Sequence, residues 1–371
     1  MRDRCLQIRA QKNAALDAVR SVAMLLGLVV HAELVIELTR GDQSLRPLYD
    51  GIHVFRMPTF FILGGYFAAS LMSRAGSRGF MLSRAKRLFA PLLAAELVIA
   101  SVLIPRGCSV CAGLGSGQWS QVGWLHLWFL AYLSVISIGF WVASNLWRRA
   151  GLDGKLAALR RPGLLAIWFV GAFALTTVVP SYLAVDGTLR MSLAIVPDAS
   201  LLALFSIFFA FGSALWAGGA GAIGLVKSCG LPMLTVGIWA YLASKDAPAP
   251  LAALDYTVAM WALPLGILGV ALMVIRASNR ALAYLSDSAY WVYLFHPAFL
   301  VALAAWMRPL QLPAILEFAV LLVATAGLSL ASYHVVARHT IIGRFLSGRR
   351  RVRRLVPTES RRAGGRWWLE R

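Results

Sequence analysis

Acidic residues are scarce in this chain. It contains 16 Asp and Glu against 36 Lys and Arg, which gives a formal net charge of +20, and charged residues make up only 14% of it. Soluble domains carry about 25% charged residues, whereas hydrophobic residues here reach 59%. This balance excludes a soluble globular protein. A positive charge of this size suits nucleic-acid binding, but the basic residues lie between apolar stretches and in the tail, so we expect no nucleic-acid partner.

Cysteine is also scarce. Four cysteines are too few for a disulfide framework. Cys108 and Cys111 form a single CSVC without a second pair or a nearby run of histidines, so we predict no metal site. A disulfide on the outer face is the one role that we consider for them. No small-residue cleavage site follows the first apolar stretch, and we expect that stretch to be a retained span rather than a signal peptide.

Ten apolar stretches fill most of the chain, each close to the 20 or so residues that cross about 30 Å of hydrocarbon. Lys and Arg gather at the N-terminus, in the loops after the second, fourth and eighth stretches, and in the tail. Because cytoplasmic loops are rich in Lys and Arg, both termini are predicted to be cytoplasmic. The predicted spans are 14–36, 52–73, 86–105, 123–144, 164–185, 198–217, 222–243, 252–275, 288–306 and 313–337.

The predicted fold class is therefore all-α: a polytopic membrane helix bundle of about ten transmembrane helices. We assign residues 1–345 to one integral-membrane domain and residues 346–371 to a basic cytoplasmic tail. The tail is expected to contact anionic membrane lipids, at about 1 kcal/mol per basic residue near the surface. Spans five to eight hold few charges, so we expect them mainly to pack the bundle.

The first span carries charged and titratable residues. Asp17 and Arg20 lie toward its inner end and His31 toward its outer end. The spacing of Arg20 and His31 brings them within about 20° of one helix face, about 16 Å apart along the axis. Charged residues in a span normally face a bundle interior or a wet cavity, so this pair indicates a functional site. The alternative is that each residue is satisfied separately and stabilises helix packing.

Further polar residues form an outer layer. In the second span, which begins GIHVFRM, His53 and Arg56 share one helix face. The fourth span opens WLHLWFL and places His126 near the same membrane surface. We predict an outer cluster of His31, His53, Arg56 and His126, provided that these helices are neighbours. Taken alone, an interfacial histidine such as His126 is more often a packing residue.

Two other segments space polar residues regularly. At the inner side, SRAKRLFAP places Arg84 and Arg87 one turn apart, where two guanidinium groups can hold phosphate. The preference of basic residues for the inner side explains these arginines equally well. The ninth span, SDSAYWVYLFHP, carries Tyr290 and then His296 before Pro297, which frees a backbone carbonyl. His296 fits a hydrogen-bonded strut as readily as a reactant.

Together these segments resemble the integral-membrane acyltransferase family three. The resemblance is carried by LDAVR with the spacing of Arg20 and His31, then by HVFRMPTFFILGGYF, SRAKRLFAP, HLWFL and SAYWVYLFHP in that order. Within the family these stretches are most similar to the glucan-biosynthesis C proteins, which are associated with succinylation of osmoregulated periplasmic glucans. The resemblance implies a multi-pass protein of the bacterial inner membrane.

The resemblance also implies the chemistry. The donor would be a cytosolic acyl-CoA, used as a substrate with no further cofactor, and the acceptor a hydroxyl of a glucan or other envelope glycan. His31 would be the general base, because an imidazole with a pKa of about 6.5 is suited to proton transfer at neutral pH. Arg20, paired with Asp17, would orient the donor. Transfer through an acyl-enzyme stays open beside direct transfer.

The remaining residues are expected to bind substrate. His53 and Arg56 would stabilise the developing oxyanion or bind the carboxylate of a succinyl donor. Arg84 and Arg87 would hold the phosphates of acyl-CoA. The predicted substrate-binding set also includes His126, Tyr290 and His296.

Two other classes of function fit part of the pattern. A transporter or flippase for a saccharide or lipid-linked glycan would also use many spans and intramembrane charge, but it typically shows an internal repeat, and we find no convincing one. A sensor that binds a ligand without turnover would tolerate the loss of His31.

Overall fold

The computed structural model describes residues 2–103, 125–151, 162–178, 196–277 and 279–340. In these ranges all regular secondary structure is helical, which confirms the predicted all-α class. The predictions for Cys108, Cys111 and the tail 346–371 lie outside the described residues. The elements are α1 (Arg2–Arg40), α2 (Arg46–Arg84), η1 (Ala85–Phe89), α3 (Ala90–Leu103), η4 (Leu125–Leu127), α5 (Trp128–Arg149), α7 (Pro162–Val178), α8 (Ala199–Ala217), α9 (Gly219–Ser228), α10 (Gly230–Asp246), α11 (Ala249–Val274), α12 (Arg280–Met307), η6 (Arg308–Leu310), α13 (Ala314–Ser332) and η7 (Tyr333–Ala337).

The helices are those of a polytopic membrane protein, as predicted. Seven helices in the described ranges are long and apolar enough to cross a membrane, or up to eight if α9 and α10, bent by 56°, form one span. One of the seven, Arg46–Leu97, includes the second predicted span and more than half of the third. Another predicted span corresponds to α7, which has 17 described residues. The number of ten spans and the side of the termini therefore stay predictions.

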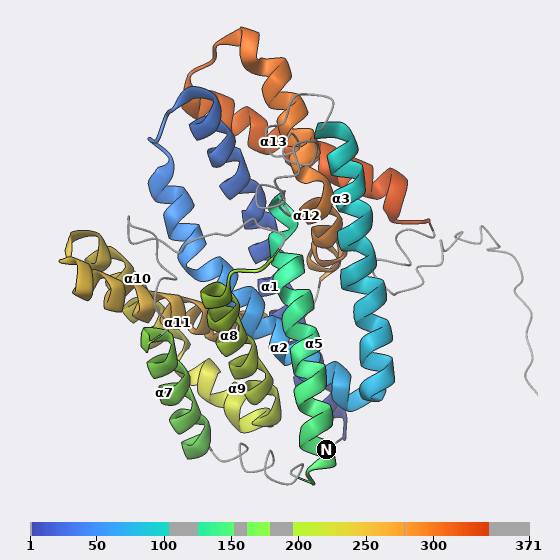
Figure 1. Ribbon diagram of the computed structural model, residues 1–371, viewed down its shortest axis with the longest axis vertical. Helices are drawn as coiled ribbons and strands as arrows, with labels where there is room; N and C mark the ends of the chain where they lie inside the picture. Colours follow the sequence, from blue (N-terminus) through green and yellow to red (C-terminus); the bar gives the residue numbers. More distant parts are fainter. Residues whose placement is uncertain (1, 104–124, 152–161, 179–195, 278, 341–371) are drawn as a thin grey trace, which may run out of the picture.

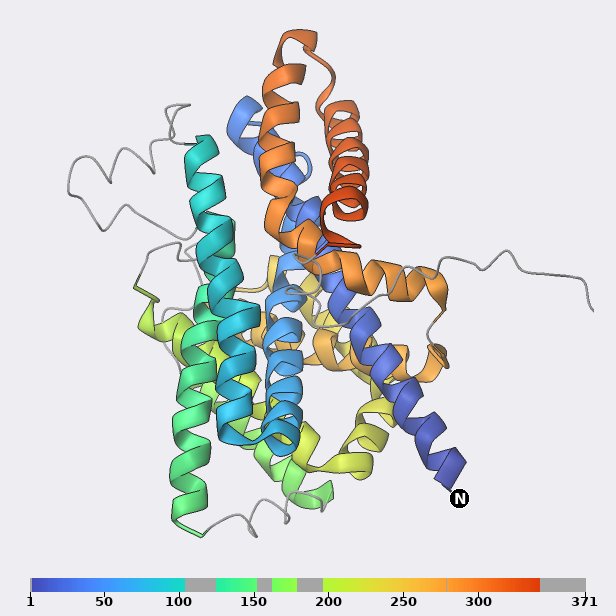
Figure 2. The same ribbon diagram turned by 90° about the vertical axis from the view of Figure 1, so that its right-hand side faces the viewer.

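The chain reverses inside the long α2 segment. Gly76 has φ 68° and ψ −178°, a backbone conformation outside the helical region that glycine adopts without a Cβ clash. Beyond it the chain returns through η1, a π-helical turn, into α3. Figure 2 shows this turn toward the lower end of the bundle, the end at which α1 starts, while the turn between α12 and α13 lies at the opposite end. In Figure 1 α3 stands on one flank and α7 to α11 on the other.

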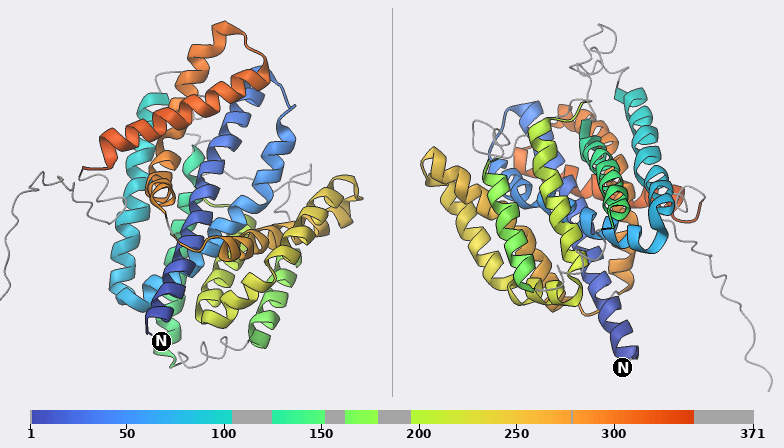
Figure 3. Two further views of the ribbon diagram at one scale, coloured as in Figure 1. Left: turned by 180° about the vertical axis from the view of Figure 1, so that it is seen from behind. Right: turned by 60° about the horizontal axis from the view of Figure 1, so that its bottom comes forward.

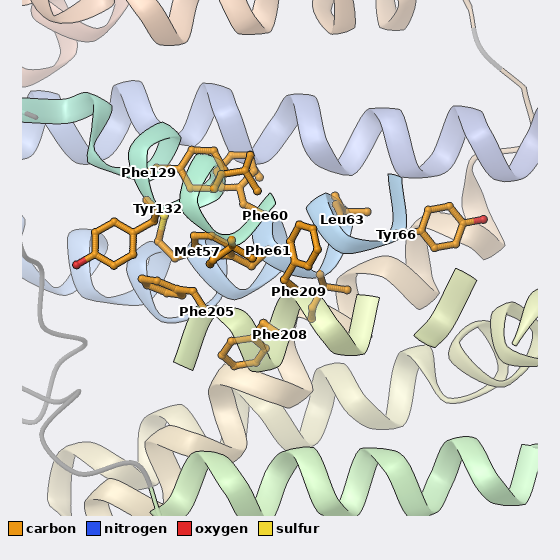
Figure 4. Packing of buried hydrophobic residues seen from close by; sticks show 14 of the residues in the cluster. Met57, Phe60, Phe61, Leu63, Tyr66, Phe129, Tyr132, Phe205, Phe208 and Phe209 are labelled. Carbon is orange, nitrogen blue, oxygen red and sulfur yellow. The ribbon is translucent and has the colours of Figure 1, made fainter. Parts of the chain in front are cut away.

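The core forms around α2. Its apolar side chains Met57, Phe60, Phe61 and Leu63 are buried against aromatic residues of α5 and α8. Figure 4 shows Phe61 between Phe129 and Phe205, and the ring centroids of Phe61 and Phe205 are 4.3 Å apart. This packing fixes the depth of α2 in the bundle, and with it the depth of the polar residues that precede Met57.

Two glycines let α2 and α8 approach at backbone distance. A Cβ at Gly65 would lie 1.8 Å from the carbonyl oxygen of Phe209, and one at Gly212 would lie 1.8 Å from that of Ile62. Neither position can hold a side chain unless the helices separate.

The other helix pair that positions the site is α1 and α12. Ala32 and Ile36 of α1 are buried with Leu300 of α12 and Leu321 of α13. At the C-terminal end of α1, Arg40 forms an ion pair with the buried Glu317 of α13. The left view of Figure 3 shows α1 and α13 from the side opposite to Figure 1. The packing of α1 against α12 determines which residues of α12 face His31.

Candidate active site

One face of α12 carries a line of polar side chains. Ser286, Tyr290, Tyr293 and His296 are spaced at three or four residues, which places them on one side of the helix. From Ser286 to His296 the line extends about 15 Å along the axis. Each of the four meets a different part of the chain, so α12 connects the inner and outer polar residues.

Hydroxyl groups connect the inner half of this line to α1 and η1 by hydrogen bonds. Ser21 of α1 donates a hydrogen bond to Ser286 Oγ at 2.9 Å. One turn on, the Tyr290 hydroxyl donates to the backbone carbonyl of Arg87 at 2.8 Å. Tyr290 therefore lies beside η1, at the level of the predicted phosphate-binding arginines.

In the outer half of the line, His296 meets two histidines of other elements, His31 of α1 and His126 of η4, and the three rings face one another. The ring centroid of His31 lies 5.1 Å from that of His296 and 6.2 Å from that of His126, and His126 and His296 are 5.6 Å apart. His296 is buried and His126 nearly so, at 1% and 8% exposed. The structure thus brings His31 and His126 together as the sequence predicts, and it adds His296.

His296 is held by the backbone that Pro297 disrupts. Proline at 297 removes the N–H that would pair with the Tyr293 carbonyl in a regular helix. His296 Nδ1 lies 3.0 Å from this carbonyl oxygen and 2.8 Å from that of Val292. Since a carbonyl only accepts, Nδ1 carries the proton, and the buried Nε2 has no hydrogen-bond partner. One ring therefore donates a hydrogen bond to the backbone through Nδ1 and keeps Nε2 as a buried acceptor without a partner.

His126 is fixed in a similar way. Its Nε2 lies 3.2 Å from the carbonyl oxygen of Leu294, so this nitrogen donates. In return the Tyr293 hydroxyl donates to the His126 carbonyl at 3.1 Å. Of these three rings, that of His31 is the one without a hydrogen bond among the described residues. Two rings are therefore held by α12, and the ring of His31 is not.

Arg56 reaches the histidine cluster from α2. It is 3% exposed, and its Nη2 lies 3.1 Å from the position that a Cβ on Gly27 would occupy. Gly27 is one helical turn before His31, so the guanidinium packs directly on α1 beside the proposed base. This contact supports the predicted association of Arg56 with His31. It is possible because Gly27 has no side chain.

His53 lies one turn before Arg56 and is 2% exposed. Its ring stacks on Tyr49 with centroids 5.2 Å apart and planes 9° apart. Neither ring nitrogen of His53 has a hydrogen-bond partner, and Arg56 Nε has none either. The outer cluster thus contains buried polar atoms that a substrate can satisfy.

The inner layer is separate. Asp17 and Arg20 form an ion pair at 3.4 Å, with side chains 35% and 39% exposed, and the Arg20 guanidinium lies 5.7 Å from the ring centre of Phe67. The structure therefore does not bring Arg20 next to His31, although the two share α1. Arg20 belongs to the inner layer and His31 to the outer layer, as their spacing along α1 predicts.

The predicted phosphate-binding arginines differ in their surroundings. Arg84 is half-buried, with its guanidinium 5.0 Å from the ring centre of Phe80 and an unpartnered Nε. Arg87 is exposed. Arg87 lies within the π-helical turn η1, which begins directly after Arg84, and the wider turn rotates Arg87 relative to an α-helical spacing.

A small apolar cavity lies elsewhere in the bundle, lined by Leu16, Leu63, Tyr66, Leu215 and Leu268 among others. No predicted site residue lines it, and we assign it no role. In the described part of the chain no group of three His, Cys, Asp or Glu side chains is placed to hold a metal ion.

Some functional candidates were missed from the sequence. Gly27 and Tyr293 contact predicted site residues directly, but a glycine and a tyrosine in an apolar helix give little signal. Glu33 is also missing from the predicted set, although a carboxylate inside a span is itself unusual. It is 1% exposed.

A polytopic helix bundle with an interior cluster of histidines and arginine is the architecture of an integral-membrane protein with a buried polar site. The family model Acyl_transf_3, described as an acyltransferase domain, matches residues 13–334. The chain belongs to this acyltransferase family, which confirms the resemblance and the prediction of an enzyme. The transporter and sensor alternatives gain no support.

Curated relatives point in the same direction. The chain is similar to proteins named Glucans biosynthesis protein C from Shigella dysenteriae serotype 1 and Escherichia coli K12, each 28% identical over 152 residues. The match covers 35% of this chain and 38% of each relative, so the chain spans well under half the length of the relatives that it matches. No solved structure matches the chain significantly.

Proposed function

We propose that this protein is an O-acyltransferase that moves an acyl group from cytosolic acyl-CoA to a hydroxyl of a periplasmic or envelope glycan, with His31 as the general base. The family match supports the reaction class, and the name of the relatives supports a glucan as the acceptor. Succinyl is our first candidate for the acyl group. A bacterial inner membrane, with CoA on one side and glycans on the other, is the compartment that this reaction needs.

The observation that carries the proposal is the position of the His31 ring, 5.1 Å from His296 and 6.2 Å from His126. His31 would take the proton of the acceptor hydroxyl as its oxygen attacks the thioester carbonyl. Collapse of the tetrahedral intermediate breaks the carbon–sulfur bond, and His31 returns the proton to the thiolate. The products are the ester and free CoA, and no net proton is released.

The other residues would bind and orient the substrates. Arg56, packed against Gly27, is placed to stabilise the developing oxyanion or to bind a donor carboxylate. Arg84 and Arg87 would hold the CoA phosphates at the inner side, and Arg20 with Asp17 would orient the donor there. The thioester arm would then follow the polar face of α12, past Tyr290, toward His296.

The test compares periplasmic and surface glycans from cells with and without the protein by mass spectrometry. We expect a mass increment that identifies the acyl group, and its loss with His31→Ala while the variant remains folded in the membrane. His334→Ala is the matched control, because His334 is exposed on η7, away from the cluster. Normal modification by His31→Ala would overturn the proposed chemistry.

A second measurement separates direct transfer from an acyl-enzyme. Purified protein is incubated with labelled acyl-CoA without acceptor, and the protein is then analysed for covalent label. Direct transfer predicts none. Label retained on the protein would replace the direct route by a two-step route.

A further inference from the structure

The turn that carries Arg87 is not regular α-helix. In η1 the backbone N–H of Ala90 donates to the carbonyl of Ala85, five residues back, where an α-helix would use a spacing of four. Pro91 follows directly. Proline has no backbone N–H, so residue 91 cannot pair with the carbonyl of Arg87, which would be its partner in an α-helix. One carbonyl of this turn therefore lacks its α-helical partner.

The side chain of Tyr290 supplies a partner from α12. Its hydroxyl donates to the Arg87 carbonyl at 2.8 Å. The ring packs against the core of the bundle and lies close to parallel with that of Tyr293, with planes 19° apart and centroids 6.5 Å apart. Because the ring is held in this way, its hydroxyl has a defined place. The hydrogen bond therefore joins η1 to α12 at one point.

The polar face of α12 also satisfies a carbonyl that a second proline frees. Pro297 removes the N–H that would pair with the Tyr293 carbonyl, and His296 Nδ1 lies 3.0 Å from that oxygen. This face thus satisfies a freed carbonyl at two places, with a hydroxyl at Arg87 and with an imidazole beside His31. At both places the contact fixes part of the proposed site.

The hydrogen bond of Tyr290 also limits what else this residue can bind. A tyrosine hydroxyl has one proton to donate. The Arg87 carbonyl accepts it, so the hydroxyl keeps only acceptor lone pairs, and these do not bind a phosphate oxygen. Tyr290, which the sequence places with the substrate-binding residues, is therefore better suited to orient η1 than to contact the donor.

We propose that Tyr290 is a positioning residue for the acyl donor: its hydroxyl fixes η1 through the Arg87 carbonyl, and so directs Arg84 and Arg87 toward acyl-CoA. The inference rests on the proposed function, which assigns the CoA phosphates to these arginines. Without the hydroxyl the turn keeps its residues but loses this link to α12. The arginines then bind the donor less well, while the histidine cluster is unchanged.

The experiment uses the full-length protein in lipid nanodiscs, with labelled succinyl-CoA and, as acceptor, glycans extracted from the periplasm of cells that lack the protein. Tyr290→Phe removes only the hydroxyl. We expect it to raise the KM for succinyl-CoA about three- to tenfold, as the loss of one hydrogen bond does, and to keep kcat within about twofold of wild type. Tyr284→Phe is the matched control and should leave both constants unchanged. Tyr284 also lies on α12, and among the described residues its hydroxyl forms no hydrogen bond.

A second background separates positioning from direct contact with the donor. Pro91→Ala supplies a backbone N–H that can pair with the Arg87 carbonyl. In this background Tyr290→Phe should change the KM for succinyl-CoA less than about twofold, because the carbonyl no longer depends on the hydroxyl. An equal rise of the KM in both backgrounds would mean that the hydroxyl touches the donor, and would overturn the inference.

Other outcomes also decide the question. A wild-type KM in Tyr290→Phe would overturn the inference, while a raised KM after replacement of both Arg84 and Arg87 would still support the proposed function. A fall in kcat without a rise in KM would place the hydroxyl in the chemical step instead. Failure of Tyr290→Phe to fold would assign the hydrogen bond to stability alone.

Discussion

The ring of His296 lies 5.1 Å from that of His31, while its Nδ1 donates to the carbonyls of Val292 and Tyr293. Nδ1 of the ring thus satisfies a carbonyl that Pro297 leaves free in α12, while the ring itself lies against that of the proposed base. Nε2 is buried and has no hydrogen-bond partner. A protonated nitrogen of His31 can donate to it, which would leave the other His31 nitrogen as the acceptor for the substrate proton.

The two sides of His296 can be tested separately. Asparagine at 296 keeps a donor near the position of Nδ1 but has no group at Nε2. We expect His296→Asn to unfold at a temperature close to wild type and to lower acyl transfer about tenfold or more, because a base oriented by a second group loses its preferred tautomer. His296→Ala also leaves the Tyr293 carbonyl unpaired, which should cost about 1–3 kcal/mol in the free energy of unfolding.

Thermal unfolding in detergent and initial rates with labelled acyl-CoA give both quantities. Wild-type activity in His296→Asn would show that the ring serves only as a strut. An equal loss of stability in the Asn and Ala variants would contradict the assignment of the proton to Nδ1.

A second prediction concerns Gly27, whose missing side chain leaves room for Arg56. A methyl group there would lie 3.1 Å from Arg56 Nη2, so Gly27→Ala should push the guanidinium away from His31. We expect acyl transfer to fall about 10- to 100-fold, since small displacements of an orienting group cost that much. Rates are measured on membranes that contain equal amounts of each protein.

Gly139→Ala is the matched control for Gly27→Ala. Gly139 lies in α5, and no atom comes within 4 Å of the position that a Cβ would occupy there, so the change should keep the rate and slightly favour the helix. Equal rates in the two variants would remove Arg56 from the proposed site.

The all-helical membrane fold and the helix faces that carry the polar residues could be predicted from the sequence because both depend on local patterns. Apolar length locates the helices, and helical spacing gives the face on which His53 and Arg56 lie. The start of the fourth predicted span puts His126 at the depth predicted for His31. The structure places the two rings 6.2 Å apart.

Which helices pack against one another could not be predicted from the sequence in the same way. His296 joins His31 because α12 packs on α1, which depends on the side chains that fit between them and not on the period of either helix. The π-helical turn that contains Arg87 changes the direction of this side chain relative to Arg84, and no local residue pattern indicates that turn. Glu33 was overlooked because the lack of a hydrogen-bond partner for its carboxylate is visible only once its surroundings are known.

A third prediction tests the close contact between α2 and α8. Gly65→Ala would place a methyl 1.8 Å from the carbonyl oxygen of Phe209, a backbone atom that cannot move alone. We expect a loss of about 1–3 kcal/mol or more in the free energy of unfolding, as for other overpacked cores. The measurement is thermal unfolding of purified protein in detergent.

The neighbouring glycine provides the control for this clash. At Gly64 the nearest atom is Leu133 Cδ1 at 3.1 Å, the end of a flexible side chain, so Gly64→Ala should cost less than about 1 kcal/mol. Similar losses in the two variants would mean that the α2–α8 approach is looser than the structure has it.

The fourth prediction concerns Arg84 and Arg87 at the inner side. If their guanidinium groups hold the phosphates of acyl-CoA, replacing both by alanine should raise the apparent KM for acyl-CoA about tenfold or more, because each charge-assisted contact is worth about 1.5–3 kcal/mol. The wild-type KM should also rise with ionic strength, and this dependence should weaken in the double variant. Initial rates in nanodiscs at two salt concentrations measure both effects.

Arg149→Ala is the control for the double variant. Arg149 is an exposed arginine in the last turn of α5, and its replacement should leave both quantities as in wild type. An unchanged KM in the double variant would assign these arginines to membrane topology alone, since the preference of basic residues for the cytoplasmic side already accounts for their presence.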